Sequence, residues 1–208
     1  MDNLKRLTLV VAGKDEASLR QFDLTHIGAA ECVLLVNYGK VPLSVIGNRF
    51  LDASLPLFGM VHADVSFGPA ALDAFADAVE SGNVCGVVGW NCDLKPGDPG
   101  ANPGDKGGRA GEVWAYQNPG PVSTLDSAAV FFRRDLGLRF DEKIFDGFHC
   151  HVEDLSIQAA ERGIPVIVPS ANATHNSALN PPVQWRRDYD VYYRRLRQKW
   201  PHVRFGVT

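Results

Sequence analysis

The sequence has no apolar run that approaches the roughly 20 residues needed to span a bilayer. Its first residues also lack the long apolar segment and small-residue cleavage site of a secretory signal peptide. We therefore expect a cytoplasmic protein with no transmembrane segment. A strong charge of one sign is absent as well, since 21 Lys and Arg stand against 24 Asp and Glu, for a formal net charge of -3. No global field draws the whole chain to nucleic acid or to an anionic membrane.

Cysteine is scarce, and its spacing excludes a metal ribbon or a disulfide framework. None of the four cysteines forms a CxxC pair, and Cys32 and Cys85 lie inside apolar runs, so we expect reduced thiols in the core. The chain has 208 residues, of which 45% are hydrophobic and 22% charged, as in ordinary globular proteins. This length predicts one α/β domain, residues 1–208.

Short apolar runs predict the strands of a sheet. Residues 7–12 and 32–36 are continuously apolar and rich in β-branched residues, which is typical of inner strands buried on both faces. The run at 57–61 leads directly into His62, Ala63 and Asp64, so polar groups follow where a parallel strand would end. Further strands are expected at 84–90, 125–132 and 164–168.

Helical periodicity appears between these strands. Leu72, Phe75, Ala76 and Val79 share one face of a segment that begins after Pro69 and ends at Gly82, and a second apolar face occurs within 152–159. The alternation of strands and helices predicts a mainly parallel sheet flanked by helices.

Two segments stand apart from this pattern. Residues 92–111 contain six glycines and three prolines, and they predict a long loop, either solvated or acting as a cationic lid through Lys106 and Arg109. Residues 183–200 predict a basic, aromatic C-terminal helix. This helix either docks by its aromatic face or offers a basic surface to an anionic partner.

Three groups of residues carry candidate chemistry. His62 and Asp64 follow a strand, where a carboxylate can hold a hard divalent cation on a diphosphate. The second group lies at the start of the predicted helix near residue 152 and contains two imidazoles and two carboxyl groups: His149, His151, Glu153 and Asp154. Acidic residues in a first turn are stabilised by the helix dipole, which explains the carboxyl groups but not the histidines. The third candidate is the single residue His175, which can be a metal ligand if it lies beside the first group.

The order of these motifs resembles the family-2-like glycosyltransferases of GT-A fold, in particular a subgroup with His-x-Asp at a strand end. The matching pieces run from about Val61 to Pro201 and are specific mainly through their order. They are Val61-His62-Ala63-Asp64-Val65, Arg139-Phe140-Asp141 leading to Phe145 and His149, Glu153-Asp154-Leu155-Ser156, Thr174-His175 and Lys199-Trp200-Pro201.

The resemblance implies a metal-dependent and inverting hexosyltransferase or related enzyme. Its cofactor would be Mn²⁺ or Mg²⁺, and its donor a nucleoside-diphosphate sugar, with a UDP-sugar as first choice. The acceptor would be a glycan, a lipid-linked sugar, a small molecule or a nucleic acid. The implied roles are Asp154 as catalytic base with Glu153 in support; Asp64 and His175 as metal ligands; His62 near ribose and metal; Gly13, Asn37 and Asn48 as nucleotide contacts; and Asp126, His149 and His151 as substrate contacts.

Two other functions stay open from the sequence. The imidazoles and Asp64 can instead bind Zn²⁺ in a metal hydrolase, although no HExxH spacing is present. The chain can also be a non-catalytic module that binds a nucleotide sugar or an anionic partner.

Overall fold

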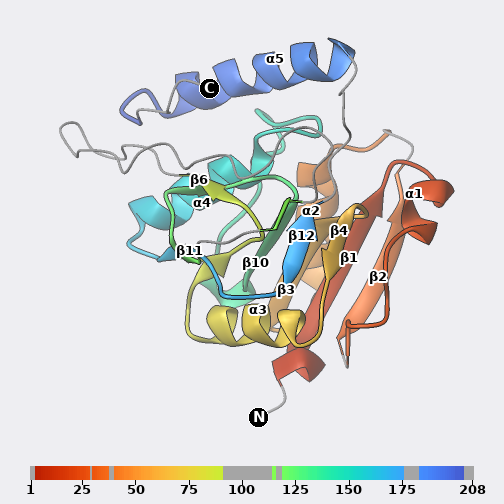
Figure 1. Cartoon of the computed structure of the whole chain (residues 1–208). Helices are drawn as coiled ribbons and strands as arrows, with labels where there is room; N and C mark the ends of the chain where they lie inside the picture. The colour runs from red at the N-terminus through yellow and green to blue at the C-terminus, as the bar shows by residue number, and fades with distance from the viewer. Residues whose placement is uncertain are drawn as a thin grey trace.

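A seven-stranded sheet organises the chain, whose computed structural model describes residues 3–28, 30–37, 40–90, 114–115, 119–175 and 183–203. The strands lie in the order β2-β1-β3-β10-β5-β11-β8 (Figure 1). Their bounds are β1 Leu7–Gly13, β2 Glu31–Val36, β3 Leu57–His62, β5 Val84–Cys85, β8 Gly120–Pro121, β10 Ala129–Arg133 and β11 Val166–Val168.

The sheet is mostly parallel. Strands β1, β2 and β3 pair in parallel, as do β5 and β11, whereas β10 runs antiparallel between β3 and β5, and β8 runs antiparallel to β11 at the edge. The expected mixed α/β architecture with a mainly parallel sheet flanked by helices is confirmed. The direction of β10 was not predicted, because an apolar run does not encode the direction in which a strand pairs.

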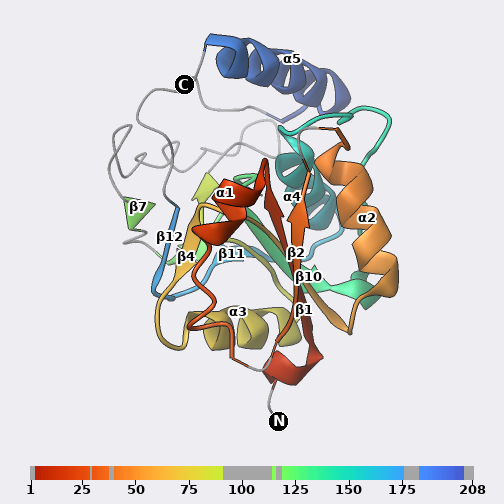
Figure 2. The ribbon, with the colours of Figure 1, turned by 90° about the vertical axis from the view of Figure 1, so that its right-hand side faces the viewer.

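Helices cover both faces of this sheet, as Figure 2 shows. On one side lie α1 and α3, and on the other α2 and α4. The hydrophobic core is accordingly divided into two main layers by the sheet. In Figure 1, α5 lies at the end of the molecule opposite the N-terminus. The bounds are α1 Glu16–Arg20, α2 Leu43–Ala53, α3 Ala71–Glu80, α4 His151–Glu161 and α5 Val183–Lys199, with two 3-10 turns, η1 Asn3–Arg6 and η2 Arg134–Leu136.

Small sheets complete the architecture. A three-stranded sheet joins β4 Val65–Phe67, β12 Ala173–His175 and β7 Trp114–Ala115, and β6 Gly89–Trp90 pairs with β9 Thr124–Leu125. Among the described residues, no helix combines the length and the apolar character that crossing a membrane requires.

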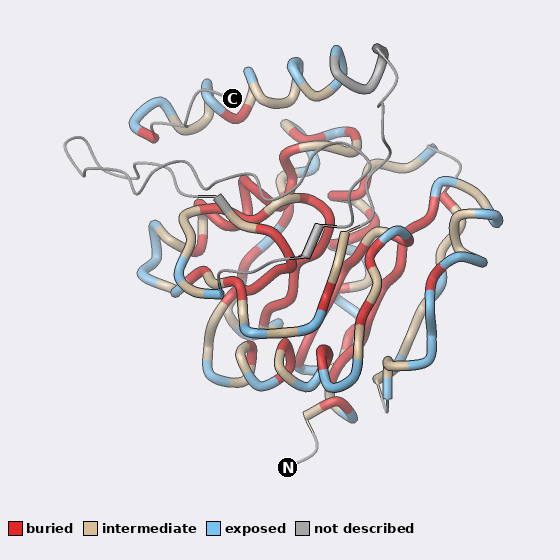
Figure 3. The backbone as a smooth tube through the Cα atoms, in the orientation of Figure 1, coloured by how far each residue is buried: buried red, intermediate tan, exposed pale blue. Residues whose placement is uncertain are grey.

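Several expectations about the elements need correction. Strand β2 was expected inside the sheet but lies at its edge, with every residue exposed or half-buried (Figure 3). The expected strand at 84–90 is divided into β5 and β6, and the expected strand at 125–132 into β9 and β10. Helix α2 was not predicted. The loop at 92–111 lies outside the described residues.

Candidate functional site

The carboxyl ends of β1 and β3 form a topological switch point, because β2 lies on one side of β1 and β3 on the other. Open α/β sheets bind ligands in the crevice outside the carboxyl ends of their strands at such a point. Backbone hydrogen bonds hold these ends together: the Asn37 N–H donates to the Gly13 carbonyl at 2.9 Å, and the Ala63 N–H donates to the Ala12 carbonyl at 3.1 Å. Polar side chains that follow β3 therefore lie where this fold class binds ligands.

Three candidate metal ligands come together at this edge. His62 ends β3, and a tight turn through Asp64 leads into β4. Strand β12 pairs antiparallel with β4 and sets His175 opposite Val65, which brings the imidazole next to Asp64. The distance from His175 Nε2 to Asp64 Oδ2 is 3.4 Å, and one ligand atom from each of the three side chains lies within 4.8 Å of the others.

Burial and the hydrogen bond between Asp64 and His175 set the pKa values in this cluster. Burial opposes ionisation of Asp64, but the hydrogen bond from His175 and the two neighbouring imidazoles outweigh it and hold the pKa of Asp64 below its usual value. Burial lowers the pKa of His62 and so keeps its ring neutral. Burial also acts to lower the pKa of His175, but the hydrogen bond to Asp64 has the larger effect together with nearby negative charges, so the pKa of His175 is raised.

The spacing of the three side chains and the state of the His62 ring are compatible with a bound metal ion. His62 Nε2 is buried and has no hydrogen-bond partner among the described residues, although a buried ring nitrogen normally has one. Metal–ligand distances of about 2.1 Å require ligand atoms about 3 Å apart. The Asp64 side chain is 44% exposed and can rotate to close the remaining gap. These residues fit a divalent cation.

A pair of carboxyl groups lies beside this cluster. The His62 N–H donates to the Ala128 carbonyl at 2.8 Å, and the Ala128 N–H donates to Asp126 Oδ1 at 2.8 Å. The next hydroxyl, Ser127 Oγ, donates to Glu153 Oε2 at 2.8 Å. Burial, and then the negative charge of Asp126, raise the pKa of Glu153 to about 8. Glu153 is therefore mostly protonated at neutral pH, and Asp126 is the more exposed of the two.

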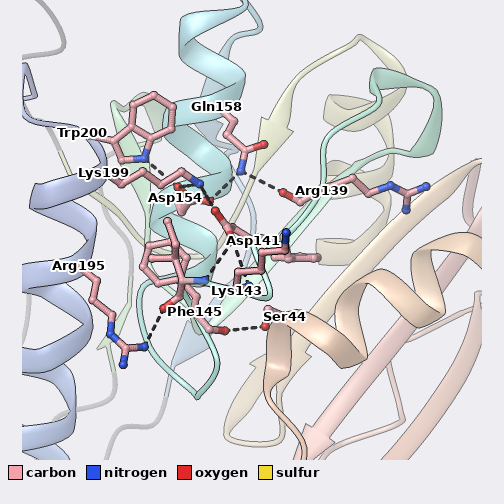
Figure 4. A network of polar contacts seen from close by, with 12 residues as sticks. Ser44, Arg139, Asp141, Lys143, Phe145, Asp154, Gln158, Arg195, Lys199 and Trp200 are labelled. Carbon is pink, nitrogen blue, oxygen red and sulfur yellow. Dashed lines mark hydrogen bonds and ion pairs between the residues drawn. The ribbon is translucent and has the colours of Figure 1, made fainter.

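Asp154 lies in a network of polar contacts with Lys199, Trp200 and Gln158 (Figure 4). Its carboxylate is fully buried and accepts hydrogen bonds from Lys199 Nζ, from Trp200 Nε1 at 2.8 Å and from Gln158 Nε2 at 2.8 Å. Lys199 Nζ also binds Asp141 Oδ2 at 2.8 Å. Successive helical residues point about 100° apart, which is why Glu153 and Asp154 diverge.

The geometry does not support the expected role of Asp154 as catalytic base. Its oxygens already accept three donors from α4 and the C-terminal segment, and no part of the side chain meets solvent. Asp154 instead joins the N-terminal part of α4 to α5.

His149, which precedes α4, and His151, its first residue, lie in different environments. His151 is fully buried against the Phe140 ring, neither ring nitrogen has a partner in the described structure, and burial lowers its pKa to about 3. This environment does not support the expected substrate contact. His149 is half-buried between Tyr189 and Tyr192, at centroid distances of 5.7 and 6.1 Å. Burial, and then the charge of His62, lower the pKa of His149 to about 4, so His149 belongs to the same region as the candidate metal ligands.

The three expected nucleotide contacts have structural uses. The Asn37 amide binds both the carbonyl and the N–H of Val41, at 2.8 and 3.1 Å, and closes the loop before α2. The Asn48 amide binds the backbone of Phe140 and ties α2 to the segment before α4. Both amides thus already bind the backbone in this arrangement. At Gly13 a Cβ would lie 2.7 Å from Leu19 Cγ, so packing against α1 already requires a glycine.

Comparisons with known proteins give distant likenesses in structure alone. No family model matches the chain, and no curated protein matches it in sequence. The S. aureus TarS fragment 1–349 is 13% identical, with a TM-score of 0.47 over 83% of this chain and 60% of that one. A197 from STIV is 15% identical, with a TM-score of 0.46 over 82% of this chain and 85% of that one. A nucleotidyl transferase from Methanothermobacter thermautotroptrophicus is 12% identical, with a TM-score of 0.39 over 91% of this chain and 98% of that one.

The present chain thus spans 60% of the length of the TarS fragment. At these identities and TM-scores the likenesses do not establish an activity, so the function rests on the residues of the site.

Three side chains that bind the candidate carboxyl groups were not recognised from the sequence. Ser127 had no motif around it, and its contact with Glu153 joins residues 26 positions apart. Lys199 and Trp200 belonged to the family-like motif, but nothing local indicated that they bind Asp154. Their adjacency at the end of an aromatic, basic helix was the available signal.

Proposed function

We propose that the chain is a glycosyltransferase that moves a sugar from a nucleoside-diphosphate sugar, with a UDP-sugar as first candidate, to an acceptor hydroxyl. The proposal rests above all on the convergence of His62, Asp64 and His175 at the switch point of the sheet. The family-like order of motifs along the chain supports it. The GT-A fold type and inverting stereochemistry belong to the same proposal.

The ligand set favours Mn²⁺ over Mg²⁺. Mg²⁺ strongly prefers oxygen ligands in octahedral geometry, whereas two imidazoles and one carboxylate suit a transition metal. A divalent cation at this site supplies charge neutralisation for a diphosphate leaving group. The half-exposed Asp64 and the less exposed His62 and His175 are the residues that would hold it.

We assign proton transfer to the pair of Asp126 and Glu153. Asp126 is partly exposed and accepts the proton of the acceptor hydroxyl, while Glu153 remains protonated behind it and limits the repulsion between the two groups. Ser127 fixes Glu153 through its hydroxyl. His149 closes the same region through its ring contacts with α5.

A thermal-shift titration with Mn²⁺ and UDP tests the metal and donor site. At a ligand concentration a hundred times Kd, the stabilisation is about 2.7 kcal/mol, or a rise in Tm of about 5–10 °C for a domain of this size. Asp64→Ala should abolish the shift. Asp73→Ala, which removes a carboxylate at the exposed start of α3, is the matched control and should retain it. A shift that survives Asp64→Ala would refute the assignment.

Activity measurements on variants distinguish the roles of Asp126, Glu153 and Asp154. Asp126→Asn and Glu153→Gln should lose hydrolysis or transfer of UDP-sugars while keeping Mn²⁺–UDP binding. If activity vanishes only in Asp154→Asn, with its fold intact, the base is Asp154 and the assignment to the pair is wrong.

The donor set favours one second candidate, a Zn²⁺-dependent hydrolase. Catalytic zinc sites commonly have three protein ligands of histidine and carboxylate, as found here. Stabilisation by Zn²⁺ alone, with no response to any nucleotide, would select this function. Nucleotide-sugar binding without turnover in the presence of any acceptor would instead select a binding module.

A further inference from the structure

The outer edge of β2 has the character of an interface. Strand β2 is the last strand of the seven-stranded sheet, and no strand in the described part of the chain pairs with its outer side. Residues 32–36 are all apolar and contain no proline or charge. In Figure 3 this strand lies at the margin of the molecule. Edge strands in monomeric proteins are usually protected by charges, proline, bulges or a covering segment.

Leu34 lies in the middle of this apolar stretch of the edge. It is 44% exposed, one of three large hydrophobic side chains that are exposed in the described residues; the others are Leu24 and Val191. Parallel strands of α/β sheets are normally covered on both faces. An exposed leucine on an open parallel edge therefore marks apolar surface that another chain can cover.

The two faces of β2 differ in what they present. Glu31 Oε2 accepts a hydrogen bond from Thr8 Oγ1, and Leu35 packs in the core layer under α2, so odd-numbered residues face α2. Cys32 packs in the opposite layer, so even-numbered residues, including Leu34, face α1 and α3. A cavity of about 310 Å³ lies along the α2 side, lined by apolar side chains together with the exposed cations Lys40 and Arg49.

We propose that two copies of this chain associate through antiparallel pairing of β2 with β2, about a two-fold axis at Leu34. Opposite residues of an antiparallel pair share a face, so this register sets Leu34 against Leu34, Cys32 against Val36 and Val33 against Leu35. The two sheets join into one, and the outer backbone groups of β2, which have no strand partner among the described residues, become paired.

Charge complementarity supports this register. Glu31 of one copy comes opposite Asn37 of the other, on the α2 side, where Lys40 and Arg49 line the cavity. By symmetry the contact occurs twice. Because Asn37 binds Gly13 at the switch point, the interface reaches the margin of the candidate ligand crevice. The inference does not depend on the proposed function.

Mass measurement by light scattering after size exclusion tests the association. The chain should elute with the mass of two copies, and Leu34→Lys should weaken dimerisation at least about tenfold. Leu24→Lys is the matched control, since Leu24 is 47% exposed but lies outside the strand; it should remain dimeric. A wild-type monomer at all concentrations, or a dimer that Leu34→Lys leaves intact, overturns the proposal.

Cross-linking tests the register. Opposite residues in antiparallel strands have Cα atoms about 4.5–5.5 Å apart, a distance that a disulfide bridges. In a background of Cys32→Ala and Cys92→Ala, Leu34→Cys should form an inter-chain disulfide on mild oxidation. Val33→Cys in the same background should not, because its opposite residue is Leu35. Equal cross-linking of both variants rejects the two-fold at Leu34.

Discussion

Removal of the Lys199 side chain should destabilise the fold without touching the candidate metal ligands. Its Nζ lies 2.8 Å from both Asp141 Oδ2 and Asp154 Oδ1 (Figure 4). Lys199→Met keeps most of the aliphatic volume and removes the charge. Asp154 then remains fully buried with only the neutral donors of Trp200 and Gln158.

The expected cost follows from the desolvation of Asp154. Breaking a buried ion pair by removing one partner costs about 3–5 kcal/mol, because the other charge is left uncompensated. The pKa of Asp154 is raised by burial in spite of Lys199, whereas the pKa of Lys199 is raised by its two carboxylate partners in spite of burial. The pair is thus costly to break but contributes little net stability. Lys199→Met/Asp154→Asn should recover most of the loss.

Stability should also depend on pH in a defined direction. A carboxyl group with a raised pKa in the folded state binds its proton more tightly there than in the unfolded chain. Its contribution to stability is complete at pH values below the pKa of the group in the unfolded chain, and it is lost as pH rises through the pKa of the group in the folded state. Lys199→Met raises the pKa of Asp154 further, so the variant should lose more stability at neutral pH than near pH 4.

Urea denaturation of the three variants at two pH values measures these effects. Arg197→Met changes an exposed residue two positions away on the same helix and should alter the free energy of unfolding by no more than about 0.5 kcal/mol. If Lys199→Met costs less than about 1 kcal/mol at neutral pH, or the double variant is no more stable than the single one, the described network does not hold α4 to α5.

Three further predictions concern other parts of the molecule. The stability of Glu153→Gln relative to the wild type should increase as pH rises from about 4.5 to about 8, because the wild type is destabilised as Glu153, whose pKa is raised, ionises. Urea denaturation at several pH values measures this difference. Parallel pH profiles for the two proteins would contradict the raised pKa of Glu153. Gly147→Ala should cost about 1–3 kcal/mol of stability and lower Tm, since a Cβ would lie 2.2 Å from the Tyr192 hydroxyl; an unchanged Tm would mean that α5 moves aside freely. His62→Ala should abolish Mn²⁺-induced stabilisation in a calorimetric scan, and retained stabilisation would exclude His62 Nε2 as a ligand.

The elements predicted from sequence were those with strong local periodicity. Helix α3 follows its apolar spacing, and the apolar runs of β1 and β3 lie at the centre of the sheet. Helix α2 was missed because it begins after Pro42 without a side-chain cap and contains Gly47, whose Cβ position is occupied by the Phe140 ring. That reason is tertiary and has no local signal.

The same limit applies to the site. Local sequence placed His62 and Asp64 at a strand end, and that position is where the structure has them. It did not decide between Glu153 and Asp154, because adjacent helical residues differ only in direction, and direction depends on what packs around the helix. The contact of Asp154 with Lys199 spans 45 positions, and the edge position of β2 depends on which strands flank it.

The route by which His175 reaches Asp64 affects when the cluster is complete during synthesis. His62 and Asp64 emerge early, but the third candidate ligand lies 111 residues after Asp64 and is positioned only when β12 pairs with β4. Domains fold as their segments leave the ribosome, so a nascent chain lacking β12 would present only two of the three candidate ligands. If the proposed metal site is real, we therefore expect capture of the cation at full affinity only after β12 has joined β4, a step that comes late in synthesis, although α5 still follows β12 in the chain.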